Sequence, residues 1–174
     1  MQLLRGGFDG GVEPVRPPWA IAEELFVELC SRCDHCLPVC PTKILERGRG
    51  GFPVVNFKHG ECEFCGDCLS VCETGALARE ADSTPPWNIK VAISQECIAY
   101  RGVVCRSCGE FCDERAIRFR PEIGGISKPS LELDLCSGCG ACVAICPVSA
   151  VTISAPTRST GANNHEEQLL EERV

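Results

Sequence analysis

The sequence has little of what usually builds a hydrophobic core. Aromatic residues make up 6% of its 174 residues, and there is one methionine. No apolar run approaches the length of a transmembrane helix, and the first residues contain neither an apolar signal segment nor a twin arginine. The formal net charge of −7 disfavours nucleic acid as a partner, because phosphate binding needs a cationic face. We therefore expect a soluble cytoplasmic protein with no membrane span.

Cysteine, in contrast, is abundant, with 16 residues. A cysteine content of about a tenth is typical of secreted disulfide scaffolds, but these need an oxidising compartment. In a cytoplasmic protein this many thiols indicate metal binding. The cysteines form four groups of four, with none left over: Cys30, Cys33, Cys36 and Cys40; Cys62, Cys65, Cys68 and Cys72; Cys97, Cys105, Cys108 and Cys112; Cys136, Cys139, Cys142 and Cys146.

Groups one, two and four share the spacing C-x2-C-x2-C-x3-C, which binds [4Fe–4S] clusters in bacterial ferredoxins. Three thiolates two residues apart can bind three corners of a cubic cluster, and small residues such as Gly138 and Gly140 let the backbone approach it. We expect the fourth cysteine to begin a short helix. Structural zinc is the alternative, but it uses two separated cysteine pairs, which fits this spacing poorly. The spacing therefore predicts three iron–sulfur clusters.

The third group differs, because seven residues separate Cys97 from Cys105. A longer repeat explains this difference, since the tripeptide PPW occurs at 17–19 and again at 85–87. Aligned on this repeat, the third group is the first group with five residues inserted after its first cysteine. A loop insertion costs little closure entropy, so we predict Cys97 as a ligand of a fourth cluster, held by a soft loop that makes it the most dispensable ligand. The alternative is a three-thiolate site with Cys97 merely packed.

The repeat predicts an α+β fold: a tandem duplication of a bacterial two-cluster ferredoxin-like unit, with short antiparallel strands and short helices around the clusters. Its expected parts are a flexible arm at 1–16, one unit at 17–80, a second at 85–155 and a disordered polar tail at 156–174. In two-cluster ferredoxins the fourth cysteine binds the other cluster of the pair. We expect this crossing within each half, although a nested pairing of group one with group four is an alternative.

Apolar patterns around the groups predict local structure. Alternating pairs before the last three groups predict strands, at Val55 and Phe57, Val91 and Ile93, and Leu131 and Leu133. A second set of pairs lies four and five residues after each last cysteine and predicts a helical turn buried against the cluster: Ile44–Leu45, Ala76–Leu77, Ala116–Ile117 and Ala150–Val151. Trp19 and Trp87, which end the repeated tripeptides, are expected to be packing anchors.

Two charged features have alternative interpretations. Arginines make the third group locally basic and form either a solvated face mixed with acidic neighbours or a docking surface, at Arg101, Arg106, Arg115, Arg118 and Arg120. His35 lies inside a cysteine loop, but no cysteine is missing there. A histidine-ligated cluster of the Rieske type is therefore not expected.

With these residues in hand, the chain resembles the NapF ferredoxin-type accessory proteins of the periplasmic nitrate reductase system. The resemblance covers most of residues 16–153 and includes the stretched third group. It rests on RPPW, GRGGFPVVNFKHGECEFCGDC, ECIAYRGVVCRSC, AIRFRP and LCSGCGACVAICPVSAV.

The resemblance implies a cytoplasmic, non-enzymatic protein that acts on the apo form of the nitrate reductase catalytic subunit before its export. Its clusters would be installed in that subunit or would reduce the subunit's own centre. The alternative function is a four-cluster electron-transfer protein that exchanges electrons with a redox partner, such as a donor protein. A zinc-bound interaction module is a more distant third.

Overall fold

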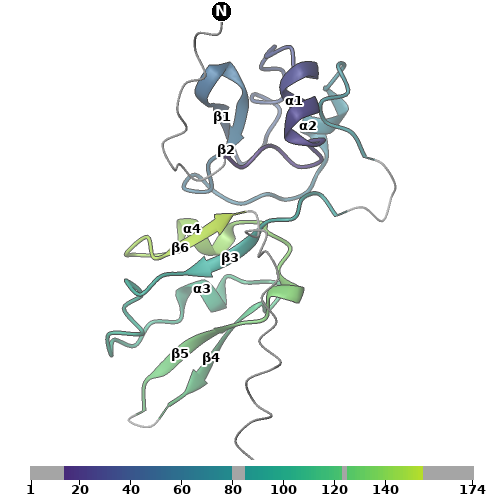
Figure 1. Cartoon of the computed structure of the whole chain (residues 1–174). Helices are drawn as coiled ribbons and strands as arrows, with labels where there is room; N and C mark the ends of the chain where they lie inside the picture. The colour runs from purple at the N-terminus through teal and green to yellow at the C-terminus, as the bar shows by residue number, and fades with distance from the viewer. Residues whose placement is uncertain (1–13, 80–84, 123–124, 155–174) are drawn as a thin grey trace, which may run out of the picture.

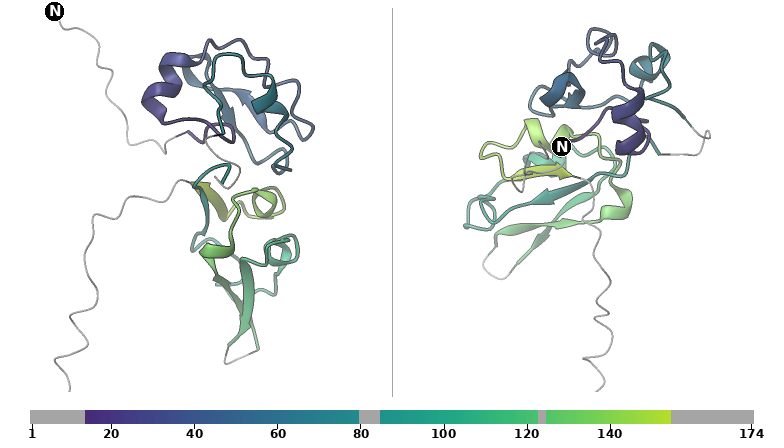
Figure 2. Two further views of the ribbon diagram at one scale, coloured as in Figure 1. Left: turned by 90° about the vertical axis from the view of Figure 1, so that its right-hand side faces the viewer. Right: turned by 45° about the horizontal axis from the view of Figure 1, so that its top comes forward.

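The computed structural model describes residues 14–79, 85–122 and 125–154. The first half contains α1 (Glu23–Leu29), β1 (Leu45–Arg47), the 3-10 helix η1 (Arg49–Gly51), β2 (Pro53–Val55) and α2 (Asp67–Ser70). The second half contains β3 (Lys90–Ile93), α3 (Ser107–Glu110), β4 (Ile117–Pro121), β5 (Ser127–Leu131), the 3-10 helix η2 (Leu133–Leu135), α4 (Ala141–Ala144) and β6 (Val151–Ser154). Figure 1 shows the first half above the second, and the views in Figure 2 keep this arrangement.

The described strands form three two-stranded antiparallel sheets. In the first half β1 pairs with β2, and the equivalent sheet of the second half pairs β4 with β5. The third sheet joins β3 to β6, with Ile93 opposite Val151, and so brings the beginning and end of the second half together. Short helices and short antiparallel sheets in two similar halves confirm the predicted fold class.

The predicted helical turns after the last cysteines are wrong, although the burial of these residues is correct. Leu45, Ile117 and Val151 are the first residues of β1, β4 and β6, and Leu77 makes an isolated bridge with Ala20. The backbone conformation just before these residues is the reason. The third residue after each last cysteine has a positive φ, at Lys43 (54°), Gly75 (74°), Arg115 (53°) and Ser149 (51°). A left-handed residue ends a turn, so the chain continues as an extended strand.

The predicted position of the short helices is also wrong, because they precede the fourth cysteine and do not begin at it. Within the described residues, α2, α3 and α4 each contain the third cysteine of a group, namely Cys68, Cys108 and Cys142. Each helix ends before the fourth cysteine, which therefore lies in the turn that follows. A cluster at the third cysteine thus contacts a helix, and the fourth cysteine is free to point toward the other group.

The strand predictions are confirmed for Val91 and Ile93, which both lie in β3. The other two pairs are each half correct. Val55 ends β2, but Phe57 lies in a turn where Asn56 Oδ1 accepts a hydrogen bond from the Lys58 N–H at 3.0 Å. Leu131 and Leu133 are divided in the same way, between the end of β5 and η2.

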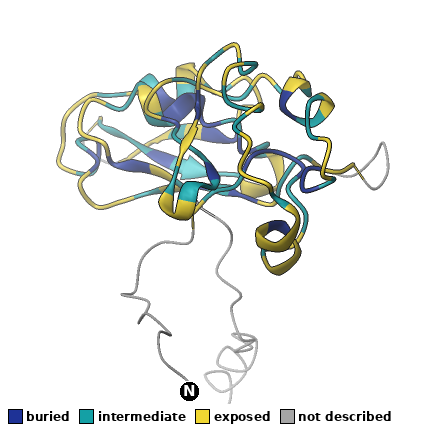
Figure 3. Cartoon of the chain, turned by 90° about the horizontal axis from the view of Figure 1, so that it is seen from above, coloured by how far each residue is buried: buried dark blue, intermediate teal, exposed yellow. Residues whose placement is uncertain are grey.

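Helix α1 is held by one apolar residue and one ion pair. Phe26 is fully buried and packs against Phe52, with ring centroids 6.2 Å apart. The Arg16 guanidinium lies 5.0 Å from the Phe26 ring and binds both carboxylate oxygens of Glu23, at 2.6 and 2.9 Å. The rest of the helix is largely exposed (Figure 3). No helix of the described chain is long and apolar enough to cross a membrane.

The predicted arm and tail fall outside the described residues, apart from 14–16, and the limits of the two units remain predictions. Residues 14–16 contact the first half, because the Val15 carbonyl accepts a hydrogen bond from the Val55 N–H at 2.8 Å.

Candidate iron–sulfur sites

Three hollows in the structure are each lined by four cysteines. In each case three cysteines come from one group and the fourth is the last cysteine of the other group in the same half. The first hollow, of about 550 Å³, is lined by Cys30, Cys33, Cys36 and Cys72. The second, of about 350 Å³, is lined by Cys62, Cys65, Cys68 and Cys40. The third, of about 310 Å³, is lined by Cys136, Cys139, Cys142 and Cys112.

The third group gathers in the same manner around Cys146. Cys97 is buried in a small cluster with Ala99 and Ala150, against which Cys146 packs. Burial, together with the neighbouring thiols of Cys97, Cys105 and Cys146, raises the pKa of the Cys108 thiol to about 11. The structure therefore brings the stretched group together despite its inserted loop.

Main-chain N–H groups point at several of these sulfurs. The sulfurs of Cys72, Cys112 and Cys146 accept hydrogen bonds from the N–H groups of Leu77, Ala116 and Ala150, at 3.3, 3.3 and 3.2 Å, respectively. Leu77 makes the isolated bridge, and Ala116 and Ala150 immediately precede β4 and β6. The N–H of Phe64 makes the same kind of contact with Cys62, at 3.4 Å. Donors of this kind stabilise cluster sulfur and thiolate charge.

Hydroxyl groups also lie next to three of the cysteine sulfurs. Thr42 Oγ1 is 3.6 Å from Cys40 Sγ, and Thr74 Oγ1 is 3.8 Å from Cys72 Sγ. Ser107 Oγ is 3.8 Å from Cys105 Sγ. The two threonines occupy the same position, two residues after a last cysteine, so the repeat C-x-T was a readable signal that the sequence analysis missed.

Burial sets the protonation of several thiols before metal binds. It raises the pKa of Cys68 and Cys142 to about 12, and of Cys36 and Cys62 to about 11. Cys33 is the opposite case, because the backbone N–H of His35 lowers its pKa. The buried thiols are thus protonated at neutral pH, and iron must displace their protons.

The donor set fits a [4Fe–4S] cluster. Each hollow offers four thiols, mostly apolar walls and N–H donors aimed at sulfur, as such clusters require. No three or more His, Cys, Asp or Glu side chains of the described chain are arranged to hold a single metal ion. The cysteines instead surround a space, and a bound cluster would supply one-electron chemistry there.

The sites differ in their access to solvent. Cys33 and Cys65 are exposed, Cys105 and Cys139 are half-buried, and Cys97 is buried. Groups one and two therefore each present a cysteine at the surface.

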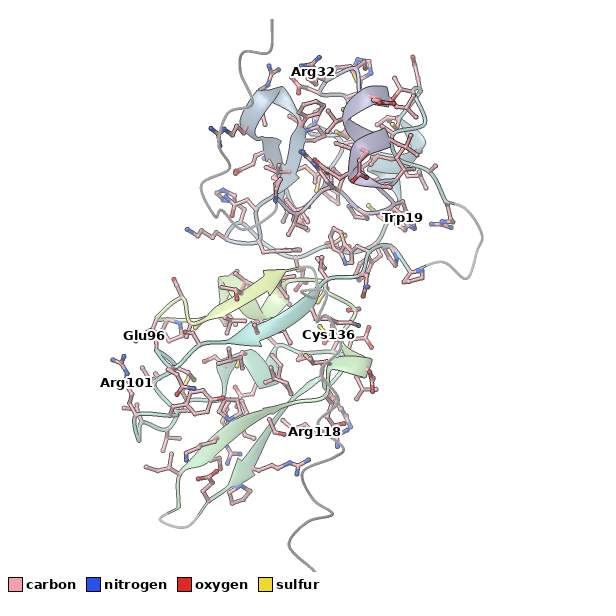
Figure 4. All side chains as sticks on the ribbon, viewed as in Figure 1. Trp19, Arg32, Glu96, Arg101, Arg118 and Cys136 are labelled. Carbon is pink, nitrogen blue, oxygen red and sulfur yellow. The ribbon has the colours of Figure 1, made fainter. Side chains whose placement is uncertain are left out.

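Intrachain contacts use three of the five predicted arginines. Arg101 pairs with Glu96 and Arg118 with Glu132, while Arg106 donates to Ser127 Oγ at 2.9 Å. Figure 4 shows Arg118 farther from the first half than Cys136. Arg115 and Arg120 are exposed and have no ion pair within the described residues.

Cysteine-lined hollows in duplicated α+β units define a ferredoxin with two clusters in each half. A model of the 4Fe-4S dicluster domain matches residues 29–76 and 102–150. The ferredoxin-type protein NapF of Escherichia coli (strain K12) is 43% identical over 86% of this chain and 90% of its own. NapF of Haemophilus influenzae is 44% identical over 80% of this chain and 78% of its own. The methylamine utilization ferredoxin-type protein MauM of Methylobacillus flagellatus is 32% identical over 91% of this chain and 75% of its own.

The chain belongs to the NapF family of ferredoxin-type proteins. Its two dicluster domains and 16 cysteines correspond to four [4Fe–4S] clusters, as predicted.

Proposed function

We propose that this protein is a cytoplasmic accessory factor that acts on the apo form of the periplasmic nitrate reductase catalytic subunit before its export. It installs or reduces the iron–sulfur centre of that subunit and turns over no small substrate. Family membership supports this role, and the surface position of Cys33 and Cys65 carries it. A ligand at the surface brings the cluster within reach of a client, which both installation and reduction need.

The ligand sets of this proposal are those that gather around each site. Site one has Cys30, Cys33, Cys36 and Cys72; site two has Cys62, Cys65, Cys68 and Cys40; site three has Cys97, Cys105, Cys108 and Cys146; site four has Cys136, Cys139, Cys142 and Cys112. Anaerobically purified protein should then contain about sixteen iron and sixteen sulfide, four of each per cluster. Stoichiometric zinc without sulfide is the contrary result.

The docking surface of the proposal is centred on Arg115 and Arg120. These arginines follow Cys112, a ligand in site four, and their charges are not neutralised by ion pairs within the described chain. The other arginines contribute less, because ion pairs neutralise Arg101 and Arg118. Charge-based docking is weakened by salt.

The test is a pull-down with apo and cluster-loaded catalytic subunit at low and moderate ionic strength. We expect preferential binding of the apo form, because only a difference in affinity between the two states can drive a handover. The double variant Arg115→Ser/Arg120→Ser should bind less, whereas Arg49→Ser, an exposed arginine of the first half, should bind normally. If neither form of the catalytic subunit binds, that subunit is not the client of this protein.

The second candidate function is electron transfer to a redox partner. The 32% identity to MauM supports a role outside nitrate reductase maturation, because a ferredoxin-type protein named for methylamine utilization matches 91% of this chain. Equal binding of the apo and loaded client would support this candidate. Cluster stability separates the two functions further, since a cluster donor needs labile clusters and an electron carrier needs inert ones.

A further inference from the structure

Two proposed ligands from different halves are directly hydrogen-bonded through their main chains. The N–H of Cys62, in site two, donates to the carbonyl of Cys139, in site four, at 2.8 Å. A continuous path therefore joins the two thiols through the side chain of Cys62, one short hydrogen bond and the side chain of Cys139. No other pair of sites from opposite halves shows such a contact in the described residues.

The indole of Trp87 packs beside this contact and binds residues of both halves. Its Nε1–H donates to the carbonyl of Ser137, which follows the first cysteine of group four, at 3.1 Å. Its ring packs edge-on against Phe57 and Phe64 of the first half, with centroids 5.8 and 6.0 Å away. Phe64 lies between the first two cysteines of group two. One side chain thus contacts the ligand loops of both sites.

Glycine allows the two ligand loops to approach this closely. A Cβ on Gly140 would lie 2.0 Å from the Phe57 ring, and one on Gly138 would lie 2.8 Å from Trp87 Nε1. Gly66 holds the matching position in group two, with nearly the same φ (83° against 88°), but a Cβ there would meet nothing within 4 Å. The missing side chain at Gly140 therefore serves the contact between halves and not only the backbone turn.

The remaining sites lie beyond this contact. Cys36 of site one packs in the same apolar cluster as Cys68 of site two, and Cys108 of site three shares another cluster with Cys142 of site four. In Figure 1, α4 lies between the first half and α3. The spatial order of the sites is therefore one, two, four, three, which differs from their order in the chain.

We propose that the Cys62–Cys139 contact is the electron junction between the two halves, so that the four sites form one continuous series. Trp87, Phe57 and Gly140 are its positioning residues. One electron leaves one site as the next site gains it, with no bond made or broken, and an external one-electron reductant supplies the first electron. This inference rests on the ligand sets proposed above and is independent of the client.

The test compares the magnetic interaction between pairs of sites in full-length, dithionite-reduced protein by EPR. Cys33→Ala/Cys105→Ala leaves sites two and four, and we expect a strong dipolar interaction between them. Cys65→Ala/Cys139→Ala leaves sites one and three, and we expect this interaction to be lost. Iron analysis verifies which sites are filled, so a wrong ligand set is distinguished from a wrong junction. No interaction between sites two and four, or an equal interaction between one and three, overturns the proposal.

A second variant tests the positioning residues with every cysteine in place. Trp87→Ala should lose the interaction between the halves and keep those within each half. Phe52→Ala, which removes an aromatic ring from the first half away from the junction, should keep both. An unchanged spectrum in Trp87→Ala with full iron content contradicts the role of the indole.

Discussion

Cys97 and Cys146 pack together in a buried cluster although they belong to different cysteine groups. The loop that follows Cys97 was expected to be soft, but its main chain is hydrogen-bonded in the structure. Successive main-chain hydrogen bonds close it, from the N–H groups of Arg101, Gly102 and Val103, at 3.1, 3.3 and 3.0 Å. Ala99 anchors it, with 1% of its surface exposed. We therefore infer that the inserted residues position the cysteine for its site.

Cys97→Ala should consequently lose as much cluster signal at site three as Cys136→Ala loses at site four. The physical reason is that both thiols are held by ordered backbone, so neither ligand is replaced easily. Iron analysis and reduced-state EPR of the two variants provide the measurement. A clearly smaller loss in Cys97→Ala would restore the three-thiolate interpretation.

Cys72→Ala should perturb the clusters of the first half and spare those of the second. Cys72 lines the hollow of group one, so its removal opens site one. Cys146→Ala is the matched control and should damage the second half only. The EPR signals that remain in each variant identify the intact half, and damage to the opposite half would support the nested pairing.

Thr74→Val should make the reduction potential of site one more negative. The Thr74 hydroxyl lies 3.8 Å from Cys72 Sγ, and donors to sulfur favour the reduced, more negatively charged cluster. Thr74→Ser keeps the hydroxyl and should keep the potential near that of the native protein. An EPR-monitored redox titration measures both variants. Equal potentials in Thr74→Val and the native protein would show that the hydroxyl does not act on the site.

Phe26→Ala should destabilise the first half by about 3–5 kcal/mol, the usual cost of emptying a buried aromatic position. Leu25→Ala, at a neighbouring position with 53% of its surface exposed, should change stability by no more than about 0.5 kcal/mol. Thermal unfolding of the cluster-loaded proteins gives the comparison. Similar losses in the two variants would mean that α1 does not depend on its buried face.

The cysteine spacing was sufficient to predict the fold class and the clusters, because ligand geometry restricts the chain so strongly. The local structure after each group was harder to predict. A small or branched residue such as Ala116 or Val151 was correctly expected to be buried, but its conformation depends on a left-handed residue one or two positions earlier. Arg115 and Ser149 give no sign of that conformation, since non-glycine residues rarely adopt it. Tertiary packing around the site selects it instead.

The contact between halves was not predictable for a different reason. Trp87 was expected to be a packing anchor, which its position between Phe57 and Phe64 confirms. Its partners lie in the other half, however, and no pattern within one half indicates them. Only the glycines of group four hinted at close approach, and their spacing was equally explained by the cluster.

The contact between the halves is heterologous, because the first half contributes Phe57 and the second half contributes Gly140, which are different positions of the repeat. The equivalent positions, Gly66 in the first half and Leu131 in the second, do not meet in this way. A Cβ on Gly66 would lie within 4 Å of nothing, and Leu131 packs inside the second half. The sequence repeat is therefore not a structural symmetry of the molecule, because only one copy of each of these positions lies in the contact between the halves.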